Sequence, residues 1–257
     1  IRSGLSTLKQ LIIPTRLEKS GISCSNALSQ YGMINGMVLP VITFPTVLTD
    51  SYSMLLIPEF STYVAQKNYK AINFIANKIF KITCSFSMCI CSIFFIFSNE
   101  LGMAIYNNVE IGYFFKVFTP FIFFMYMDHI IDCILKGLNK QFGVMCCNIL
   151  DLSITTCFIY FLLPILGIKG YVLSIFFSEV LNFSISLFQL FKYSKIKPNL
   201  IDWIAVPLFC SLVSFFVLSV FRFNFVNLIV NLIFNILLFV LVYVVTFFII
   251  NMSKIKK

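Results

Sequence analysis

Apolar stretches, most of them separated by short polar loops, fill this chain of 257 residues almost end to end. Hydrophobic residues make up 60% of the sequence and charged residues 11%, and the mean hydropathy is +0.96. Soluble domains are about 25% charged, and a chain this apolar cannot bury its side chains in one aqueous core. We therefore predict an all-α polytopic membrane protein that uses lipid as its solvent.

Seven of the eight apolar stretches approach or exceed the roughly 20 residues that a helix needs to cross the hydrocarbon core. The first is too short and begins without methionine, and no basic region or cleavage site precedes it, so it does not resemble a signal peptide. We expect it to be the outer half of a helix that begins upstream, which would make the chain a fragment. The stretches are Ile1–Ile13, Tyr31–Ile57, Ile79–Phe97, Ile111–Lys136, Phe142–Leu163, Tyr171–Phe191, Trp203–Phe221 and Phe225–Asn251.

The basic residues of the loops predict the orientation, because cytoplasmic loops carry an excess of Lys and Arg. We expect the loop 14–30 to lie outside and the C-terminus to lie in the cytoplasm. The cations on the predicted cytoplasmic side are Lys67, Lys70, Lys78, Lys81, Lys136, Lys140, Lys192, Lys195, Lys197, Lys254, Lys256 and Lys257, and those on the outer side are Arg16, Lys19, Lys169 and Arg222. The net charge of +9 follows from this topology and needs no nucleic-acid partner.

Ionisable residues at membrane depth are costly and mark functional sites, so they supply the candidate cavity residues. Arg2 lies 11 residues before the expected outer end of its helix, near the midplane. An arginine stays charged and binds carboxylate or phosphate with a planar fork, which suits an anionic substrate. The alternative is an arginine that neutralises a buried acid. Asn35 and Asp50, in the second stretch, are further cavity candidates.

Asp128, Asp132 and Lys136 form one stripe on the fourth stretch, with His129 beside it. Asp132 and Lys136 are spaced to pair, and Asp128 is the member expected to face a water-filled cavity. The stripe predicts a proton- or cation-responsive site, or else a helix end that lies among cytoplasmic headgroups. For Asp151 and Glu179 we expect hydrogen bonds between helices, which is the commoner role of such residues.

Flexible points gather in the second and fourth stretches. Pro40, Pro45 and Pro120 each remove a backbone hydrogen bond and favour a kink. Gly36, with Gly32 one turn earlier, forms a small-residue face suited to close helix contact. Broken helices in membranes line cavities, where the freed carbonyls find partners.

No enzyme motif is present, and we predict neither catalytic residues nor a cofactor. His129 is the single histidine, which excludes two-histidine metal sites within the chain, and no metal site is predicted. Nine cysteines without a paired pattern are expected to be small buried apolar residues. The last two stretches, with Arg222 between them, predict a hairpin that is either a lipid-facing edge of the bundle or a groove for lipid tails.

Short motifs along the whole chain resemble the stage V sporulation protein B family of polysaccharide-type lipid flippases. These motifs are IRSGLSTLKQLIIP at 1–14, ALSQYG at 27–32, GMVLP at 36–40, LLIPE at 55–59, GLNK at 137–140 and GIKGY at 167–171. The family lies in the multidrug/oligosaccharidyl-lipid/polysaccharide exporter superfamily, with MurJ and the MATE transporters as relatives.

The resemblance implies a 14-helix transporter of two six-helix lobes around a cavity, followed by a C-terminal hairpin. On this view residues 1–198 form the second lobe, with its first helix truncated, and residues 199–257 form the hairpin and a cytoplasmic tail. The first lobe of the same protein would be an obligatory partner. In lipid-flipping relatives cavity arginines bind diphosphate and the final hairpin adds an apolar groove, which implies these roles for Arg2 and the hairpin.

The predicted function is therefore alternating-access flipping of an undecaprenyl-diphosphate-linked peptidoglycan precursor for the spore cortex, with a lipid-linked glycan and membrane lipid as partners. A teichoic or capsular oligosaccharide on the same scaffold is the nearest alternative. A drug/cation antiporter predicts acidic cavity residues and has no clear use for Arg2. A non-transporting scaffold for cell-wall synthases should tolerate alanine at Arg2.

Overall fold

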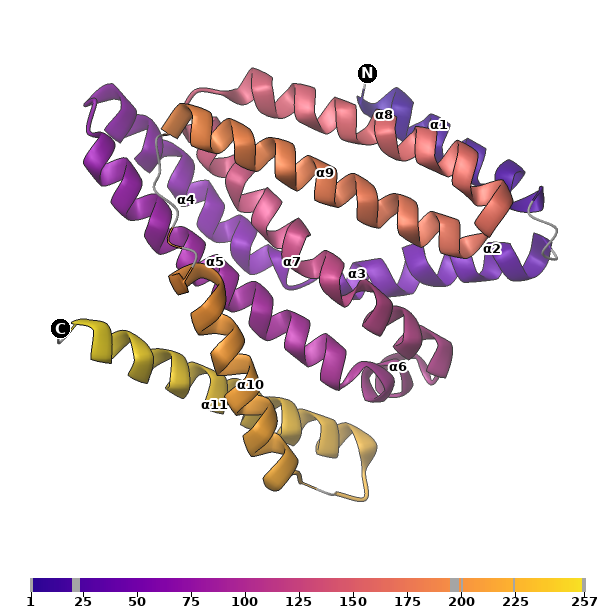
Figure 1. Cartoon of the computed structure of the whole chain (residues 1–257). Coiled ribbons are helices and arrows are strands. Elements are labelled where there is room, and N and C mark those ends of the chain that lie inside the picture. The colour runs from indigo at the N-terminus through magenta and orange to yellow at the C-terminus, as the bar shows by residue number, and fades with distance from the viewer. Residues whose placement is uncertain (1, 20–23, 195–198, 200, 224, 256–257) are drawn as a thin grey trace. The chain divides into compact units, whose positions relative to one another are not determined.

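The computed structural model describes residues 2–19, 24–194, 199, 201–223 and 225–255 (Figure 1). Within these ranges the chain is helical and has no strand. Six helices are long and apolar enough to cross a membrane, and a bent pair, Leu28–Thr43 with Thr46–Ala65, makes a seventh. The predicted all-α, multi-pass membrane class is thus confirmed, and each of the seven long apolar stretches corresponds to one of these spans.

The chain divides into two compact units, Ile1–Asn73 with Phe124–Ile196, and Phe74–Phe123 with Lys197–Lys257. We call them unit 1 and unit 2. The helices α5 and α7 each contribute to both units, so the boundaries at residues 73/74 and 123/124 fall inside helices. The predicted division at residues 198/199 was argued from topology and resemblance rather than from packing, and it stays a prediction.

Unit 1 is built around α8, which packs against α9 and α1 (Figure 1). Leu17 of α1 and Ile159 of α8 are both fully buried. The helices that contribute to unit 1 are α1 (Arg2–Glu18), α2 (Cys24–Met33), the π-helix η1 (Ile34–Val38), α3 (Leu39–Thr43), α4 (Thr46–Ala65), α7 (Val109–Gly137), α8 (Gln141–Leu166) and α9 (Ile168–Ser194).

The first helix is longer than predicted, because it continues through Pro14 to Glu18. Proline removes one backbone hydrogen bond, but Ile13 and Leu17 on either side of it are 1% and 0% exposed, so packing holds the extra turn. Arg2 is consequently the first residue of a 17-residue helix about 26 Å long. It lies further from the outer end of this helix than the sequence suggested, and thus deeper toward the predicted cytoplasmic side.

The second span is bent by 53° between Thr43 and Thr46, where Phe44 and Pro45 form a turn. Pro40 is the second residue of α3, which follows η1 directly, and the N–H of Leu39 donates to the carbonyl of Ile34. The wider π turn accommodates a proline without a backbone donor. Pro120, by contrast, lies inside α7, which is continuous from Val109 to Gly137.

Two glycines of unit 1 allow close approach of neighbouring helices, and a third makes a turn with positive φ. A Cβ on Gly137 would lie 2.6 Å from the Cβ of Phe60, and one on Gly170 would lie 2.5 Å from the carbonyl oxygen of Leu162. Gly167, at φ 58°, makes the single-residue break between α8 and α9.

The motifs LLIPE and GLNK meet across α4 and α7, where Ile57 also lies against Gly137. Ser61, one turn beyond Ile57 on α4, donates a hydrogen bond to the carbonyl of Gly137 at 3.1 Å. The expected contact at Gly32 and Gly36 is absent among the described residues, because nothing lies within 4 Å of a Cβ at either position.

Unit 2 contains a core of Phe97, Cys210 and Phe239, each at most 1% exposed. Gly102 and Gly112 bring the helices α6 and α7 together, since a Cβ on Gly102 would lie 2.5 Å from the backbone nitrogen of Gly112. The further helices of this unit are α5 (Tyr69–Ile96), α6 (Ser98–Tyr106), the π-helix η2 (Ile201–Ala205), α10 (Val206–Val220) and α11 (Leu228–Ile255).

Candidate functional site

The interior of unit 1 holds acidic side chains that are each hydrogen-bonded by a neighbouring helix. Asp128 and Asp132 on α7 are 7% and 9% exposed. Asn182 of α9 donates to Oδ2 of Asp128 at 2.8 Å, and Asn148 of α8 donates to Oδ2 of Asp132 at 3.2 Å. The side chain expected to face a water-filled cavity, Asp128, is therefore buried among helices of its own unit.

Asp151 extends this polar layer between α8 and α9. The hydroxyl of Ser178 donates to Oδ1 of Asp151, and the hydroxyl of Thr155 donates to the backbone carbonyl of Asp151 at 2.8 Å. The geometry is that of a hydrogen bond between helices, as expected for Asp151 from the sequence. Glu179 is half-buried on α9, one residue from Ser178, and its role stays a prediction.

His129 lies beside the stripe and contacts a different helix. Its Nε2 is 3.1 Å from Oδ1 of Asp50 on α4, and the two side chains are 41% and 45% exposed. The structure thereby brings together two candidates that are 79 positions apart in the sequence. The pair ties α4, just after the bend at Pro45, to α7.

Lys136 lies in a polar pocket of about 490 Å³ between α1, α7 and α8. Asn148, another wall residue, also holds Asp132. The pocket offers an ammonium group, amides and a hydroxyl, which are donors suited to an anionic group. Its lining is Ser3, Lys136, Gln141, Val144, Met145, Asn148 and Ile149.

Arg2 directly precedes Ser3 of this pocket in α1. Its side chain lies outside the described residues, so the prediction that it binds an anion is neither supported nor contradicted. Sequence reasoning missed Ser3 and Gln141 as pocket residues, since neither is charged and nothing in their spacing marks them. Lys136 was recognised as a cation of the predicted cytoplasmic side and as a partner for Asp132, not as a pocket residue.

Asn35 belongs to a different cluster at η1. Its Oδ1 accepts a hydrogen bond from the hydroxyl of Tyr171 at 3.0 Å, and its Nδ2 donates to the carbonyl of Tyr31 at 3.2 Å. The rings of Tyr31 and Tyr171 pack edge to face with centroids 5.2 Å apart. The amide of Asn35 thus links η1 to α9, and the structure does not bring it together with Asp50 or Asp128.

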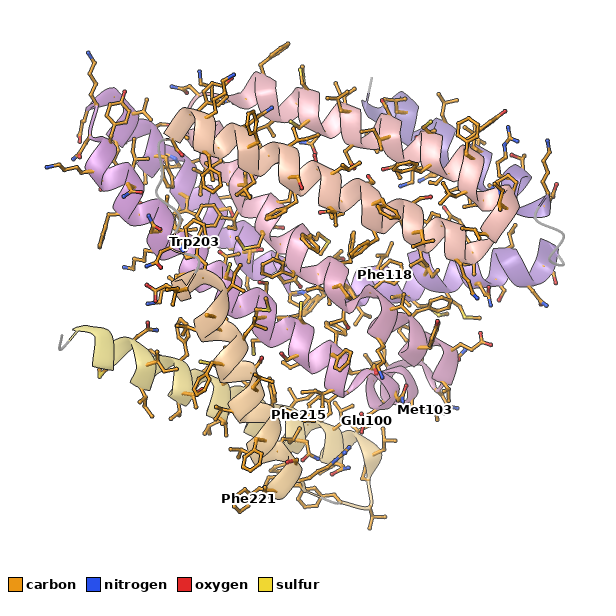
Figure 2. All side chains as sticks on the ribbon, viewed as in Figure 1. Glu100, Met103, Phe118, Trp203, Phe215 and Phe221 are labelled. Atoms are coloured by element: carbon orange, nitrogen blue, oxygen red, sulfur yellow. The ribbon has the colours of Figure 1, made fainter. Side chains whose placement is uncertain are left out.

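Unit 2 carries a separate, apolar cavity of about 400 Å³ between α5, α7 and α10. The side chains of Phe95 on α5 and Phe215 on α10 face it, and Figure 2 labels Phe215 on its helix. Apart from Cys91 and the hydroxyls of Ser92, Thr119 and Ser211, the lining is apolar, which suits a hydrocarbon chain.

Two curated proteins of Bacillus subtilis (strain 168) are similar to this chain. Stage V sporulation protein B is 26% identical over 190 residues, which are 73% of this chain and 36% of that protein. Sporulation protein YkvU is 21% identical over 139 residues, which are 53% of this chain and 31% of that protein. The matched segments therefore span about a third of each relative's length.

No family model matches the chain, and no solved structure matches it. The similarity to two sporulation proteins confirms the resemblance inferred from the short motifs, and the chain is a relative of stage V sporulation protein B.

Proposed function

We propose that this chain is the C-terminal part of a sporulation flippase that moves an undecaprenyl-diphosphate-linked peptidoglycan precursor across the membrane by alternating access. The observation that carries the proposal is the polar pocket around Lys136, next to Arg2 on α1, in a relative of a sporulation membrane protein. A cationic, donor-rich pocket at the end of several spans suits a diphosphate headgroup.

In this proposal the substrate is held in two places. Arg2 and Lys136 bind the diphosphate, and the apolar cavity at α10 receives part of the polyprenyl tail. The headgroup site belongs to unit 1 and the tail site to unit 2. The first lobe of the same protein would complete the headgroup cavity.

Movement between the inward- and outward-open states would use the bends of the helices. Pro40 and Pro45, with Gly36 in η1, are the proposed hinge in the second span, and Pro120 is a proposed flexible point in α7. Asp128 and the Asp50–His129 pair are candidates for coupling the cycle to protons or to the membrane potential.

The test is a flipping assay with the full-length protein in proteoliposomes. Fluorescent lipid-linked disaccharide-pentapeptide is placed in both leaflets, and translocation is followed by chemical bleaching of the outer leaflet. Losing a charged hydrogen bond to the diphosphate costs about 1.5–3 kcal/mol, so Arg2→Ala and Lys136→Ala should each slow flipping roughly 10- to 100-fold.

Lys169→Ala is the matched control, because Lys169 is an exposed cation at the start of α9. Flipping by both pocket variants at the rate of this control would refute the headgroup site. If a teichoic or capsular oligosaccharide lipid is flipped faster than the peptidoglycan precursor, the alternative substrate is supported. Cation-dependent drug efflux without lipid flipping would favour the antiporter.

A further inference from the structure

The turn between α10 and α11 is apolar and aromatic, although it connects two exposed helix ends. We call residues 221–223 and 225–228 the hairpin tip. Phe221 is 65% exposed and Phe225 is 45% exposed. The rings of Phe223 and Phe225 stack with centroids 5.8 Å apart, and Phe234 of α11 packs against both. Three phenylalanines thus form one ordered cluster at the end of the hairpin.

The backbone of the hairpin tip is satisfied by asparagine side chains of α11. Asn235, which is 1% exposed, accepts from the N–H of Phe223 at 2.9 Å and donates to the carbonyl of Phe223 at 3.0 Å. Asn231 accepts from the N–H of Phe225 at 3.4 Å, and Asn227 caps the first turn of α11. Water would satisfy these groups in an exposed loop, whereas a loop within lipid must satisfy them internally.

The single charge of the described hairpin tip is also neutralised. Nη2 of Arg222 lies 2.5 Å from Oε1 of Glu100 on α6. Figure 2 shows Glu100 on α6 and Phe221 at the end of α10, with Trp203 on η2, which precedes α10 in the same span. An ion pair at the border of the hydrocarbon core lowers the cost of bringing the tip to that depth.

The lengths of the helices place the hairpin tip at the edge of the hydrocarbon core. The span Ile201–Val220 has 20 residues, which at 1.5 Å per residue is about 30 Å, the thickness of that core. Exposed apolar side chains dominate from Phe216 on α10 and Ile229 on α11 to the hairpin tip. Val220, Phe221 and Val226 are exposed there, and Ser219 and Asn227 are the exposed uncharged polar residues described in these stretches. The lipid-facing surface of the hairpin therefore includes its turn.

From this geometry we propose that the hairpin tip is inserted in the interfacial layer of the leaflet at the outer end of α10 and anchors the hairpin there. The partner that covers the hairpin tip is lipid, at the boundary between headgroups and acyl chains, where aromatic side chains are favoured. The proposal does not depend on the transported substrate, so it can fail or hold independently of the proposed function.

Tryptophan fluorescence tests the depth directly, because this chain contains one tryptophan, Trp203. Phe225→Trp is made in the full-length protein with Trp203 and any tryptophan outside this chain replaced by phenylalanine, and the protein is reconstituted in phosphatidylcholine vesicles. We expect lipids brominated near the headgroup end of the acyl chain to quench about half of the emission, with little quenching by aqueous iodide. Gln66→Trp in the exposed α4–α5 loop is the matched control, for which the reverse is expected.

Strong quenching of Phe225→Trp by iodide, at the level of the Gln66→Trp control, would overturn the proposal. Protection from both quenchers would also overturn it, because the hairpin tip would then be covered by protein. Phe223→Trp gives a second reporter in the same cluster if the first variant does not fold.

Asn235→Leu supplies an independent test in the Phe225→Trp background. In lipid, loss of this amide leaves two backbone groups of Phe223 without partners, so the hairpin tip should withdraw to water and become iodide-accessible. A tip that already lies in water loses little, because solvent replaces the amide. Unchanged quenching in the Asn235→Leu variant would contradict insertion.

Discussion

Removing the hydroxyl of Tyr126 tests whether α7 holds the bend of the second span in place. Tyr126 is fully buried on α7, and its hydroxyl donates to the carbonyl of Ile42 at 2.9 Å. Ile42 lies in the last turn before the break at Pro45. Tyr126→Phe keeps the ring and its packing and deletes only the donor.

The expected cost follows from the burial of the bond. Hydrogen bonds between helices of membrane proteins average about 0.6 kcal/mol and reach about 1.7, and a buried carbonyl left without a donor costs roughly 1–3 kcal/mol. Because the tyrosine side chain is 0% exposed, water does not replace the donor, and we expect about 1–2 kcal/mol. For a chain of this size that corresponds to a decrease in melting temperature of about 2–8 °C.

Melting of the full-length protein in detergent can be followed with a thiol-reactive dye in a Cys157→Ser background, since Cys157 is exposed whereas Cys133 on α7 is 4% exposed and becomes accessible on unfolding. Tyr113→Phe is the matched control on the same helix, because Tyr113 is 61% exposed. All variants are heated at one rate, because unfolding of such proteins is often irreversible.

A Tyr126→Phe melting temperature within about 1 °C of the Tyr113→Phe control would refute the reasoning. Hydrogen exchange at residues 40–48 separates the two ways in which the variant could lose stability. Faster exchange confined to these residues would indicate a loosened bend, whereas a uniform increase would indicate a weaker fold throughout.

Three further substitutions have outcomes that the packing predicts. Gly137→Ala places a Cβ 2.6 Å from the Cβ of Phe60 on α4, so it should lower the free energy of unfolding by about 1–3 kcal/mol. Gly32→Ala, with nothing within 4 Å of the new Cβ, should be neutral or slightly stabilising. Equal melting temperatures of the two variants would contradict this. Ser178→Ala removes a buried hydroxyl that donates to the half-buried carboxylate of Asp151 and should cost about 1 kcal/mol. No change is expected for the exposed Ser153→Ala, and the difference is read by thermal melting. Arg222→Gln breaks the half-exposed ion pair with Glu100 and should lower the free energy of unfolding by at most about 1 kcal/mol. A loss of folded protein on expression would show that the pair is needed for folding.

The sequence determined the class of the protein and the places where its chain crosses the membrane. Runs of about 20 apolar residues leave no other solvent than lipid, so the spans could be counted without any knowledge of packing. The motifs LLIPE, GLNK and GIKGY were visible as letters, and their similarity to a sporulation protein was visible too. The reason for the glycines in these motifs was not visible in the sequence. Gly137 and Gly170 are explained only by the neighbouring atoms that they contact in the folded chain.

Only the tertiary structure decided which polar residues meet. Asp50 meets His129, Asp128 meets Asn182, and Ser3 meets Lys136 in one pocket, although the two residues of each pair are far apart in the chain. Their meeting depends on helix rotation, which apolar stretches in lipid do not encode. In a bilayer every face of a span is apolar enough to look alike from the sequence. Close packing and the few interhelical hydrogen bonds select among these faces, and both are properties of the folded chain.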